Sequence, residues 1–231
     1  MNVIIGGTSL LNSSIFNNWD EQKIETPYGY VQVKINENNV FLQRHGNPLK
    51  PPHMINHKAN IWALKGLNVQ RVFSINSVGS LKVKIKPGMF VLPDDFISPW
   101  HIPTFFDDEV RFIVPEMNRA LRDYIYILCM ELHMDVHGSG VYIQTTGPRL
   151  ETKAEIIMLR RFGDIVGMTM ASEATLCMEY EIPYTSICSV DNYCHGIVKV
   201  PLTIEEIGKN SQKNMKAIEK LIHTLLNRGF A

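Results

Sequence analysis

The chain has 231 residues, of which 45% are hydrophobic and 20% charged, a balance typical of a globular protein with a sizeable core. Basic and acidic residues number 23 each, so the formal net charge is zero and a general nucleic-acid or anionic-membrane binder is not indicated. No apolar run approaches the ~18 residues of a membrane span, so none is expected.

The cysteines predict core thiols, because none forms a CxxC pair, no histidine cluster lies beside them, and all but Cys194 lie in apolar runs. They are Cys129, Cys177, Cys188 and Cys194. We therefore expect a reducing, cytoplasmic setting and no metal site. The N-terminal apolar run lacks a basic flank and breaks at Gly6-Gly7, which favours a first strand over a signal peptide.

Short β-branched runs alternate with longer helical patterns along the chain. The first half predicts strands over 3–5, 30–35, 40–43, 71–75 and 89–92, with a helix over 55–65. The second half predicts strands over 140–144, 164–168 and 184–190, with helices over 115–134, 151–162, 172–181 and 203–228. Thr203 and Glu206 fit a capping box, and Gly229 fits a helix stop.

No linker divides this pattern, so we expect one α/β domain over 1–231. The alternation predicts a twisted mixed sheet with helices on both faces. Ligands of such sheets bind at the carboxyl ends of strands.

Polar residues follow four of the predicted strands. A Gly-Gly-Thr-Ser turn can cradle a phosphate with backbone N–H groups and hydroxyls, and an Arg-His pair adds a guanidinium fork and a second donor. Each piece alone is compatible with an ordinary turn or surface pair, but together they predict an anion pocket. Its residues are Thr8, Arg44, His45, Asn76, Ser77 and Thr169.

Two further strand ends carry groups that can read the edge of a purine. Glu151 lies just past a Gly-Pro turn, and Asp191 with Asn192 ends another apolar run. A carboxylate accepts hydrogen bonds, and an amide can both donate and accept them. Glu173 has two interpretations, a ribose ligand or a carboxylate favoured at a helix N-terminus. No Walker or GxGxxG motif is present, so triphosphate or dinucleotide use is not indicated.

Many motifs in one order resemble the trimeric purine nucleoside phosphorylase and methylthioadenosine phosphorylase family. They are GGTSL, TPYG, QRHG, PPHMINHKANIWAL, NSVGSL, KPGMFVLPDDFI, GPRLETKAE, MTMASEA and DNYCHG, and they cover nearly the whole chain. The resemblance implies the nucleoside phosphorylase fold and the attack of inorganic phosphate on C1′ of a purine nucleoside. It also implies no cofactor and a homotrimer or a dimer of trimers. Neighbouring subunits would supply residues from the loop 100–106.

The same resemblance implies a role for each matching position. Phosphate would be held by Thr8, Arg44, His45, Asn76, Ser77 and Thr169, with the ribose near Met168. The base would be held by the GPRLE segment with Leu150 and Glu151, and by Asn192 with its neighbours Asp191 and Cys194.

Two departures from the adenosine-type pattern favour a 6-oxopurine. That branch has an aspartate where ungapped alignment from Met168 puts Asn192, and a small hydroxyl residue where Glu151 stands. An amide can donate to O6 or N7, and a carboxylate accepts from the N1–H that only a 6-oxopurine carries. The alternative is methylthioadenosine, which requires Asp191 to take the acid role.

The start of the last helix would face the 5′ end of the ribose. Ile204 and Ile207 make an apolar slot suited to a methylthio group, unless both simply pack in the core. The combination predicts 5′-methylthioinosine, with inosine or guanosine as poorer substrates. Other departures, at Ser9, Leu49 and Ser172, motivate a second alternative, a non-catalytic nucleoside-binding relative.

Overall fold

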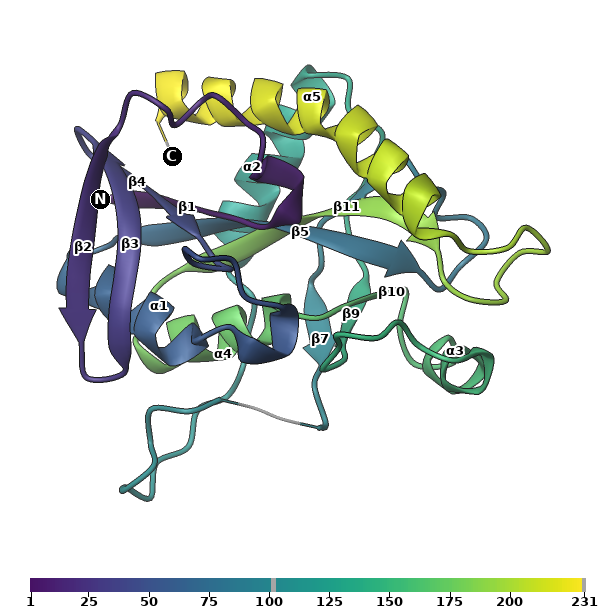
Figure 1. The fold of residues 1–231 in the computed structure, drawn as a ribbon, viewed down its shortest axis with the longest axis horizontal. Helices are drawn as coiled ribbons and strands as arrows, with labels where there is room; N and C mark the ends of the chain where they lie inside the picture. Colours follow the sequence, from purple (N-terminus) through teal and green to yellow (C-terminus); the bar gives the residue numbers. More distant parts are fainter. Residues whose placement is uncertain (101–102, 230–231) are drawn as a thin grey trace.

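The computed structural model describes residues 1–100 and 103–229 and arranges them around one sheet (Figure 1). Within these residues the strands are β1 (Asn2–Gly6), β2 (Asp20–Thr26), β3 (Gly29–Asn36), β4 (Asn39–Gln43), β5 (Arg71–Ser80), β6 (Phe90–Val91), β7 (Asp95–Ile97), β8 (Val136–His137), β9 (Val141–Gln144), β10 (Ile165–Gly167) and β11 (Tyr184–Tyr193). The α-helices are α1 (His57–Gly66), α2 (Arg119–Glu131), α3 (Lys153–Leu159), α4 (Met170–Glu179) and α5 (Ile204–Arg228).

The long strand β5 organises the sheet. It pairs in parallel with β1 and β11 and antiparallel with β10, and the main path runs β2-β3-β4-β1-β5-β10-β9-β7. Because β4, β1, β5 and β11 are parallel, their carboxyl ends meet at one edge. Strand β10 runs the opposite way beside the carboxyl-terminal part of β5, where Val166 pairs with Gly79. The predicted mixed sheet is confirmed, and its topology gathers five strand ends in one place.

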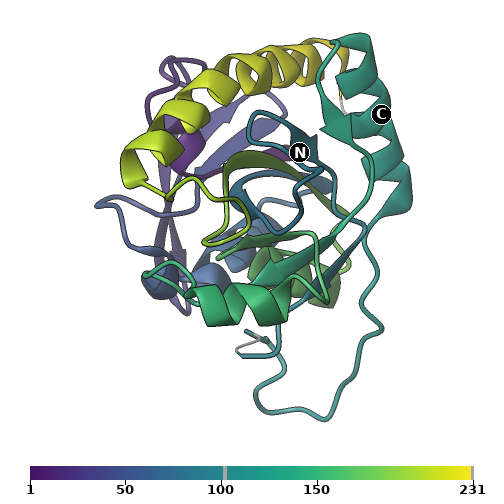
Figure 2. The same ribbon diagram turned by 90° about the vertical axis from the view of Figure 1, so that its right-hand side faces the viewer.

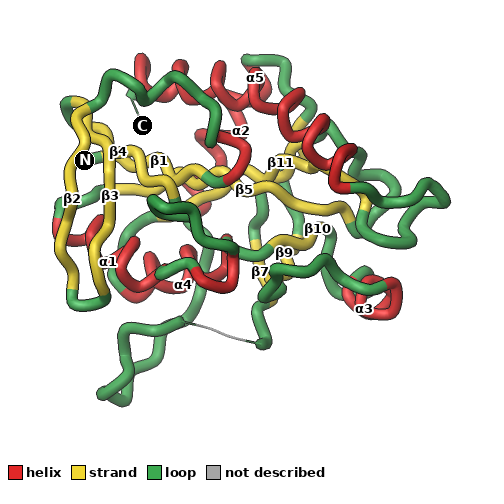
Figure 3. The backbone as a smooth tube through the Cα atoms, in the orientation of Figure 1, coloured by secondary structure: helices red, strands yellow, loops and turns green. Residues whose placement is uncertain are grey.

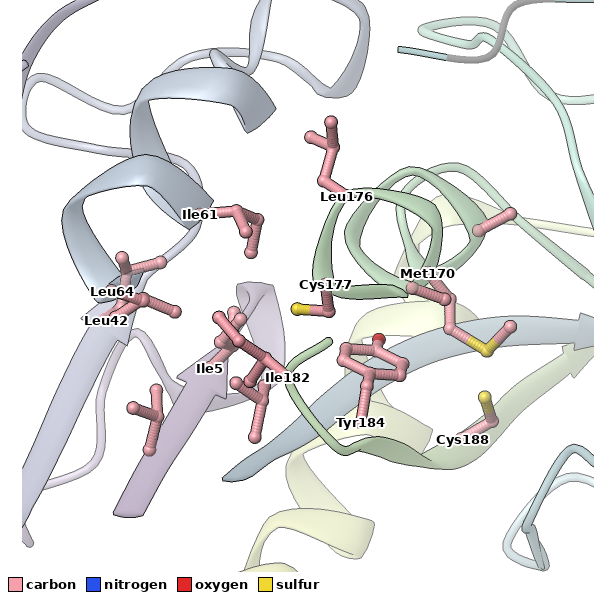
Figure 4. Close-up of a cluster of buried hydrophobic side chains, with 14 of the residues drawn as sticks. Ile5, Leu42, Ile61, Leu64, Met170, Leu176, Cys177, Ile182, Tyr184 and Cys188 are labelled. Carbon is pink, nitrogen blue, oxygen red and sulfur yellow. The ribbon is translucent and has the colours of Figure 1, made fainter. Parts of the chain in front are cut away.

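Helices cover both faces of this sheet. Figures 1 and 3 show α2 and α5 on one face and α1 and α4 on the other. Each face has its own apolar core: Ile125 of α2 and Ile222 of α5 pack in one, and Ile61 of α1 and Cys177 of α4 pack in the other. Figure 4 shows the second core, where Tyr184 of β11 lies beneath α4. Figure 2 shows the loop before α2 extending away from this layered body.

The predicted helices and the strands predicted over 30–35 and 40–43 are confirmed, and these two strands, β3 and β4, form an antiparallel hairpin. Thr203 caps α5 by accepting from the Glu206 backbone N–H at 3.2 Å, and Gly229 ends the helix with a φ of +78°. Strands β5 and β11 extend further than their apolar runs indicated, because polar residues continue the pairing into the site. Strand β2 was missed because it is a mostly exposed edge strand without apolar alternation. None of the described helices is long and apolar enough to cross a membrane.

Candidate active site

A cavity of about 180 Å³ lies where these strand ends meet. Most residues predicted for the site line it: Thr8, Arg44, His45, Ser77, Leu150, Glu151, Met168, Thr169, Asn192, Cys194 and Ile207. Gly79 and Val166, which were not among the predicted site residues, also line it. A second hollow shares Pro52 and Met168 with this cavity, so the two adjoin.

Three predicted residues do not line the cavity. Ile204 is 74% exposed as the first residue of α5, so the expected slot wall at this position is wrong. Leu202 takes its place, together with Ile207. Asn76 and Asp191 are fully buried behind the cavity wall, and each bonds to a residue that does line it. Neither side chain is therefore in direct contact with the cavity.

The guanidinium of Arg44 lies in a buried network behind the first loop. Its Nε donates to Glu173 Oε1 at 2.6 Å, and its Nη1 donates to the Ile75 carbonyl at 2.8 Å. A Cβ on Gly7 would lie 2.3 Å from Nη1, so only glycine lets the loop approach so closely. Glu173 also accepts from Tyr184 at 3.1 Å, and its side chain is 2% exposed. The ribose-ligand interpretation of Glu173 is therefore not supported, because the carboxylate is the counter-ion of Arg44.

Asn76 controls the direction of the Thr169 hydroxyl. Its Nδ2 donates to Thr169 Oγ1 at 2.9 Å, and its Oδ1 accepts from Ser186 Oγ at 2.6 Å. Because an amide N–H can only donate, the Thr169 hydroxyl hydrogen remains available for the cavity.

His45 was expected to donate a hydrogen bond to the anion, but the neutral ring offers the cavity an acceptor instead. Its Nδ1 lies 2.8 Å from the Lys50 carbonyl oxygen, which can only accept, so Nδ1 carries the hydrogen. Burial lowers the pKa of His45, an effect that the Lys50 hydrogen bond opposes and nearby Arg44 supports. In the neutral ring Nε2 then offers a lone pair. The second donor expected at His45 exists only when the ring is charged.

A bulge in β11 separates the neighbours Asp191 and Asn192. Val190 pairs with Val78 and Asn192 pairs with Gly79, which leaves Asp191 unpaired in the ladder. Asn192 consequently faces the cavity, whereas Asp191 points into the protein with no exposed surface. Its expected contact with the base is therefore wrong.

Close packing fixes Asn192 against β5. A Cβ on Gly79 would lie 2.6 Å from Cys194 Sγ and 3.1 Å from Asn192 Nδ2. Asn192 Nδ2 also donates to the Tyr193 carbonyl at 3.0 Å. Burial raises the pKa of Cys194, so its thiol stays neutral beside the cavity.

Glu151 is oriented by a residue that sequence analysis missed. Thr145 Oγ1 donates to Glu151 Oε1 at 2.7 Å. The signal was available, because Thr145 lies in the same TTGPRLE segment on the other side of the Gly-Pro turn. Beyond the turn, Arg149 pairs with Glu155 at 2.7 Å, and Thr152 caps α3. Thr145 thus holds the carboxylate of Glu151 directly, while the Arg149–Glu155 pair and the cap fix the backbone that follows the turn.

Among residues 1–100 and 103–229, no three His, Cys, Asp or Glu side chains are grouped closely enough to hold a metal ion. The four cysteines are all free and buried.

Comparison with protein families adds an independent finding. Residues 3–227 match the phosphorylase superfamily. The chain is 36% identical to a probable 6-oxopurine nucleoside phosphorylase of Archaeoglobus fulgidus, over 97% of this chain and 95% of that protein. It is 40% identical to a probable S-methyl-5′-thioinosine phosphorylase of Methanocaldococcus jannaschii, over 98% of this chain and 92% of that protein.

Relatives that are named for methylthioadenosine, a 6-aminopurine nucleoside, are about as similar to this chain. The chain is 38% identical to an S-methyl-5′-thioadenosine phosphorylase of Saccharolobus solfataricus, over 97% of this chain and 87% of that protein. Among solved structures, methylthioadenosine phosphorylase from Schistosoma mansoni in complex with adenine has a TM-score of 0.87. It is 23% identical, over 96% of this chain and 88% of that chain, a level that shows the shared fold.

Proposed function

The chain belongs to the phosphorylase superfamily, and we propose that it catalyses the phosphorolysis of a purine nucleoside. A phosphate oxygen forms a bond to C1′ of the ribose while the bond from C1′ to the base breaks. The electron pair of that bond passes to the purine, and the products are the free base and a ribose 1-phosphate. Inorganic phosphate is the co-substrate, and no cofactor is required.

The observation that carries this proposal is one cavity with two chemically different ends. Thr8, Arg44 and Thr169 line one end, where Gly7 beside Thr8 abuts the Arg44 guanidinium. Glu151 and Asn192 line the other end, where both lie near Cys194. Such a cavity can hold phosphate and nucleoside in line, which lowers the entropic part of the barrier. The phosphate dianion stabilises the cationic character that develops at C1′. The Asn192 amide can stabilise the negative charge that develops on the leaving purine.

The residue chemistry favours a 6-oxopurine, whereas similarity alone does not choose a base. The Asn192 amide can donate to O6 or N7, and Glu151 can accept from N1–H. Adenine has no N1–H, so its N1 lone pair would face the carboxylate. The methylthioadenosine alternative needs Asp191 as an acid, and Asp191 points away from the cavity. That orientation weighs against the alternative.

The 5′ end of the nucleoside would lie against Leu202 and Ile207, the apolar residues that line the cavity near the start of α5. An apolar wall favours a methylthio group over a hydroxyl, because an unpaired hydroxyl loses its bonds to water. We therefore propose 5′-methylthioinosine as the preferred substrate and inosine and guanosine as poorer ones. The reaction would serve purine salvage.

We also propose a homotrimer, or a dimer of trimers, as the working assembly. The loop before α2 projects from the body (Figure 2), and Val110, Phe112 and Val114 on it are 89% exposed or more. Apolar side chains so fully exposed favour contact with another copy of the chain. Four free thiols fit a reducing cytoplasm.

The loop 100–106 was expected to reach a neighbouring subunit. Residues 101–102 lie outside the described part of the chain. Within the rest of the loop, Thr104 Oγ1 and the Phe105 backbone N–H both donate to Glu179 of the same chain, each at 2.6 Å. Phe105 also stacks on Tyr180, with ring centroids 4.2 Å apart. If this loop contacts a neighbouring subunit, it does so while Thr104 and Phe105 remain bound to the end of α4 in their own chain.

The test is to incubate the pure protein with 5′-methylthioinosine or methylthioadenosine, with and without phosphate, and to follow base release. Phosphate-dependent hypoxanthine release with little adenine release supports both the reaction and the base. Preferential adenine release keeps the reaction and overturns the base assignment. No release from either nucleoside, or from inosine or guanosine, favours a non-catalytic nucleoside-binding relative.

A further inference from the structure

The anion end of the cavity includes a hydroxyl whose hydrogen is directed away from any ligand. Ser77 lines the cavity, and its Oγ donates a hydrogen bond to Asp191 Oδ2. Asp191 has no exposed surface and does not line the cavity. Because the hydroxyl has a single hydrogen, Ser77 then faces the cavity with lone pairs.

The direction of this hydrogen bond depends on Asp191 being an ionised acceptor. Its Oδ1 accepts from Ser189 Oγ at 2.6 Å and from Asn214 Nδ2 at 3.3 Å. Asn214 Nδ2 also lies 3.4 Å from the Val190 carbonyl, an acceptor that fixes the orientation of the amide. Burial raises the pKa of Asp191 above its ordinary value, and the hydrogen bonds that the carboxylate accepts from Ser189, Ser77 and Asn214 oppose this rise.

The surrounding helix holds this carboxylate in place. Asn210 and Asn214 lie four residues apart on α5, and Asn210 Nδ2 donates to the Asp191 carbonyl at 2.8 Å. Helix α5 therefore binds the bulge of β11 twice, through the Asp191 carboxylate and through the Asp191 backbone carbonyl. Rotation of the Asp191 side chain toward the cavity would break its bonds to Ser77, Ser189 and Asn214.

The anion end consequently offers acceptors as well as donors. The Thr169 hydroxyl receives a hydrogen bond from Asn76 and can donate to a ligand. Ser77 has the opposite polarity, and the neutral His45 ring adds a second lone pair at Nε2. A site made only for a fully deprotonated oxyanion needs donors alone, because every ligand oxygen is then an acceptor.

We propose that Asp191, acting through Ser77, makes the anion end selective for a protonated oxyanion, hydrogen phosphate, over sulfate. The inference rests on the proposed function, since it takes phosphate as the co-substrate. Hydrogen phosphate carries one P–O–H group, which can donate to Ser77 Oγ. Sulfate carries no hydrogen at neutral pH, so one of its oxygens would face the Ser77 lone pairs without a partner. Asp191 is a positioning residue here, because of its hydrogen-bond partners only Ser77 lines the cavity.

The test compares inhibition by sulfate with the KM for phosphate in the wild type and in Asp191→Asn. In the variant, the new amide can place its Nδ2 toward Ser77 and its oxygen toward Ser189 and Asn214. The hydroxyl of Ser77 then receives a hydrogen bond and turns its own hydrogen to the cavity. The ratio of the sulfate Ki to the phosphate KM is expected to fall by about tenfold or more, the usual effect of one hydrogen bond to a charged group.

Two further variants make the test independent of how Asp191→Asn folds. Ser77→Ala removes the acceptor and should raise the phosphate KM about tenfold with little change in the sulfate Ki. Ser189→Ala removes a hydrogen bond from the other oxygen of the same carboxylate and should leave the ratio within about twofold. A loss of stability alone would move both anions together in all three variants.

The outcomes separate this inference from the proposed function. If the wild type turns over nucleoside but sulfate inhibits at concentrations near the phosphate KM, the selectivity is refuted and the phosphorylase remains. An unchanged ratio in both Asp191→Asn and Ser77→Ala also refutes it. If no nucleoside is turned over, the proposed function fails, and thermal stabilisation by phosphate against sulfate still reports the selectivity. Equal stabilisation by the two anions would then overturn it.

Discussion

Arg44 Nε and Glu173 Oε1 lie 2.6 Å apart, and both side chains are only 2% exposed. Ser74 donates to the second oxygen of Glu173 at 2.7 Å and receives a hydrogen bond from Arg44 at the same distance. The pair ties the strand end after β4 to the first turn of α4. A guanidinium placed in this way contributes positive potential to the anion end without moving when a ligand enters, which is how preorganised electrostatic stabilisation works.

Removal of one partner should therefore destabilise the fold. Glu173→Gln leaves the Arg44 charge buried without its counter-ion, and such uncompensated charges typically cost about 3–5 kcal/mol. We expect the free energy of unfolding in urea to fall by about that amount. The matched control is Glu205→Gln, which breaks an exposed pair with Lys209 and should change stability by less than about 1 kcal/mol. Equal effects of the two substitutions would contradict a structural role for the buried pair.

This pair also shows where sequence analysis reaches its limit. Arg44 and Thr169 were predicted to gather because polar residues at parallel strand ends meet at one edge. The partner of Arg44 is 129 residues away along the chain, and a glutamate in the first turn of a helix has an ordinary explanation of its own. Side-chain partners across such a separation depend on packing, which the pattern of residue types does not encode.

The sequence also does not predict which of two adjacent side chains faces the cavity. Asp191 and Asn192 are adjacent, and only the bulge in β11 decides which one faces the cavity. A shift of one residue in a strand reverses the two faces, so the apolar run before them could not choose. The same applies at α5, where Leu202 and not Ile204 lines the cavity, because the exact start of the helix sets which side chains turn inward.

The absence of a side chain at Gly79 should be essential for catalysis. Gly79→Ala would put a methyl group 3.1 Å from Asn192 Nδ2 and 2.6 Å from Cys194 Sγ, so one of them must move. We expect kcat/KM to fall roughly 10- to 100-fold, because small displacements of a positioned group are costly. Steady-state kinetics with the preferred nucleoside measures this.

The control for Gly79→Ala is Gly208→Ala in α5. A Cβ at Gly208 meets no atom within 4 Å. Alanine is favoured over glycine in a helix, so this variant should keep its activity and gain about 0.5–1 kcal/mol of stability. Wild-type activity in Gly79→Ala would show that Asn192 tolerates displacement.

Thr145 should act on the base through Glu151. Thr145→Val removes the hydrogen bond at 2.7 Å to Oε1 but keeps the size of the side chain. The carboxylate then loses the hydrogen bond that orients it, and we expect kcat/KM for a 6-oxopurine nucleoside to fall about tenfold. A control variant, Thr224→Val on the exposed face of α5, should leave it unchanged. Equal kinetics for Thr145→Val and the wild type would show that Glu151 needs no such support.

The buried His45 ring should make stability depend on pH. Burial lowers its pKa in the folded state below the ordinary value of about 6.5. The unfolded chain therefore binds more protons, and stability falls as pH falls through about 6.5 toward the folded-state pKa. Thermal unfolding between pH 8 and pH 5 should show a shallower decline for His45→Gln than for the wild type. Parallel curves would mean that the ring titrates alike in both states.

Asn192→Asp tests the base assignment most directly. A new carboxyl at this position would share the cavity with Glu151, and the neighbouring negative charge would raise its pKa and favour the protonated acid. A protonated acid can donate to N7 of adenine, whereas Glu151 still disfavours the N1 lone pair. The single substitution should therefore raise the ratio of kcat/KM for methylthioadenosine to that for 5′-methylthioinosine by about tenfold, without a full reversal. Glu151→Gln in addition supplies an amide donor for N1 and should complete the change, since a site rejects a base that leaves its polar groups unpaired. An unchanged ratio in both variants would contradict the roles of Asn192 and Glu151.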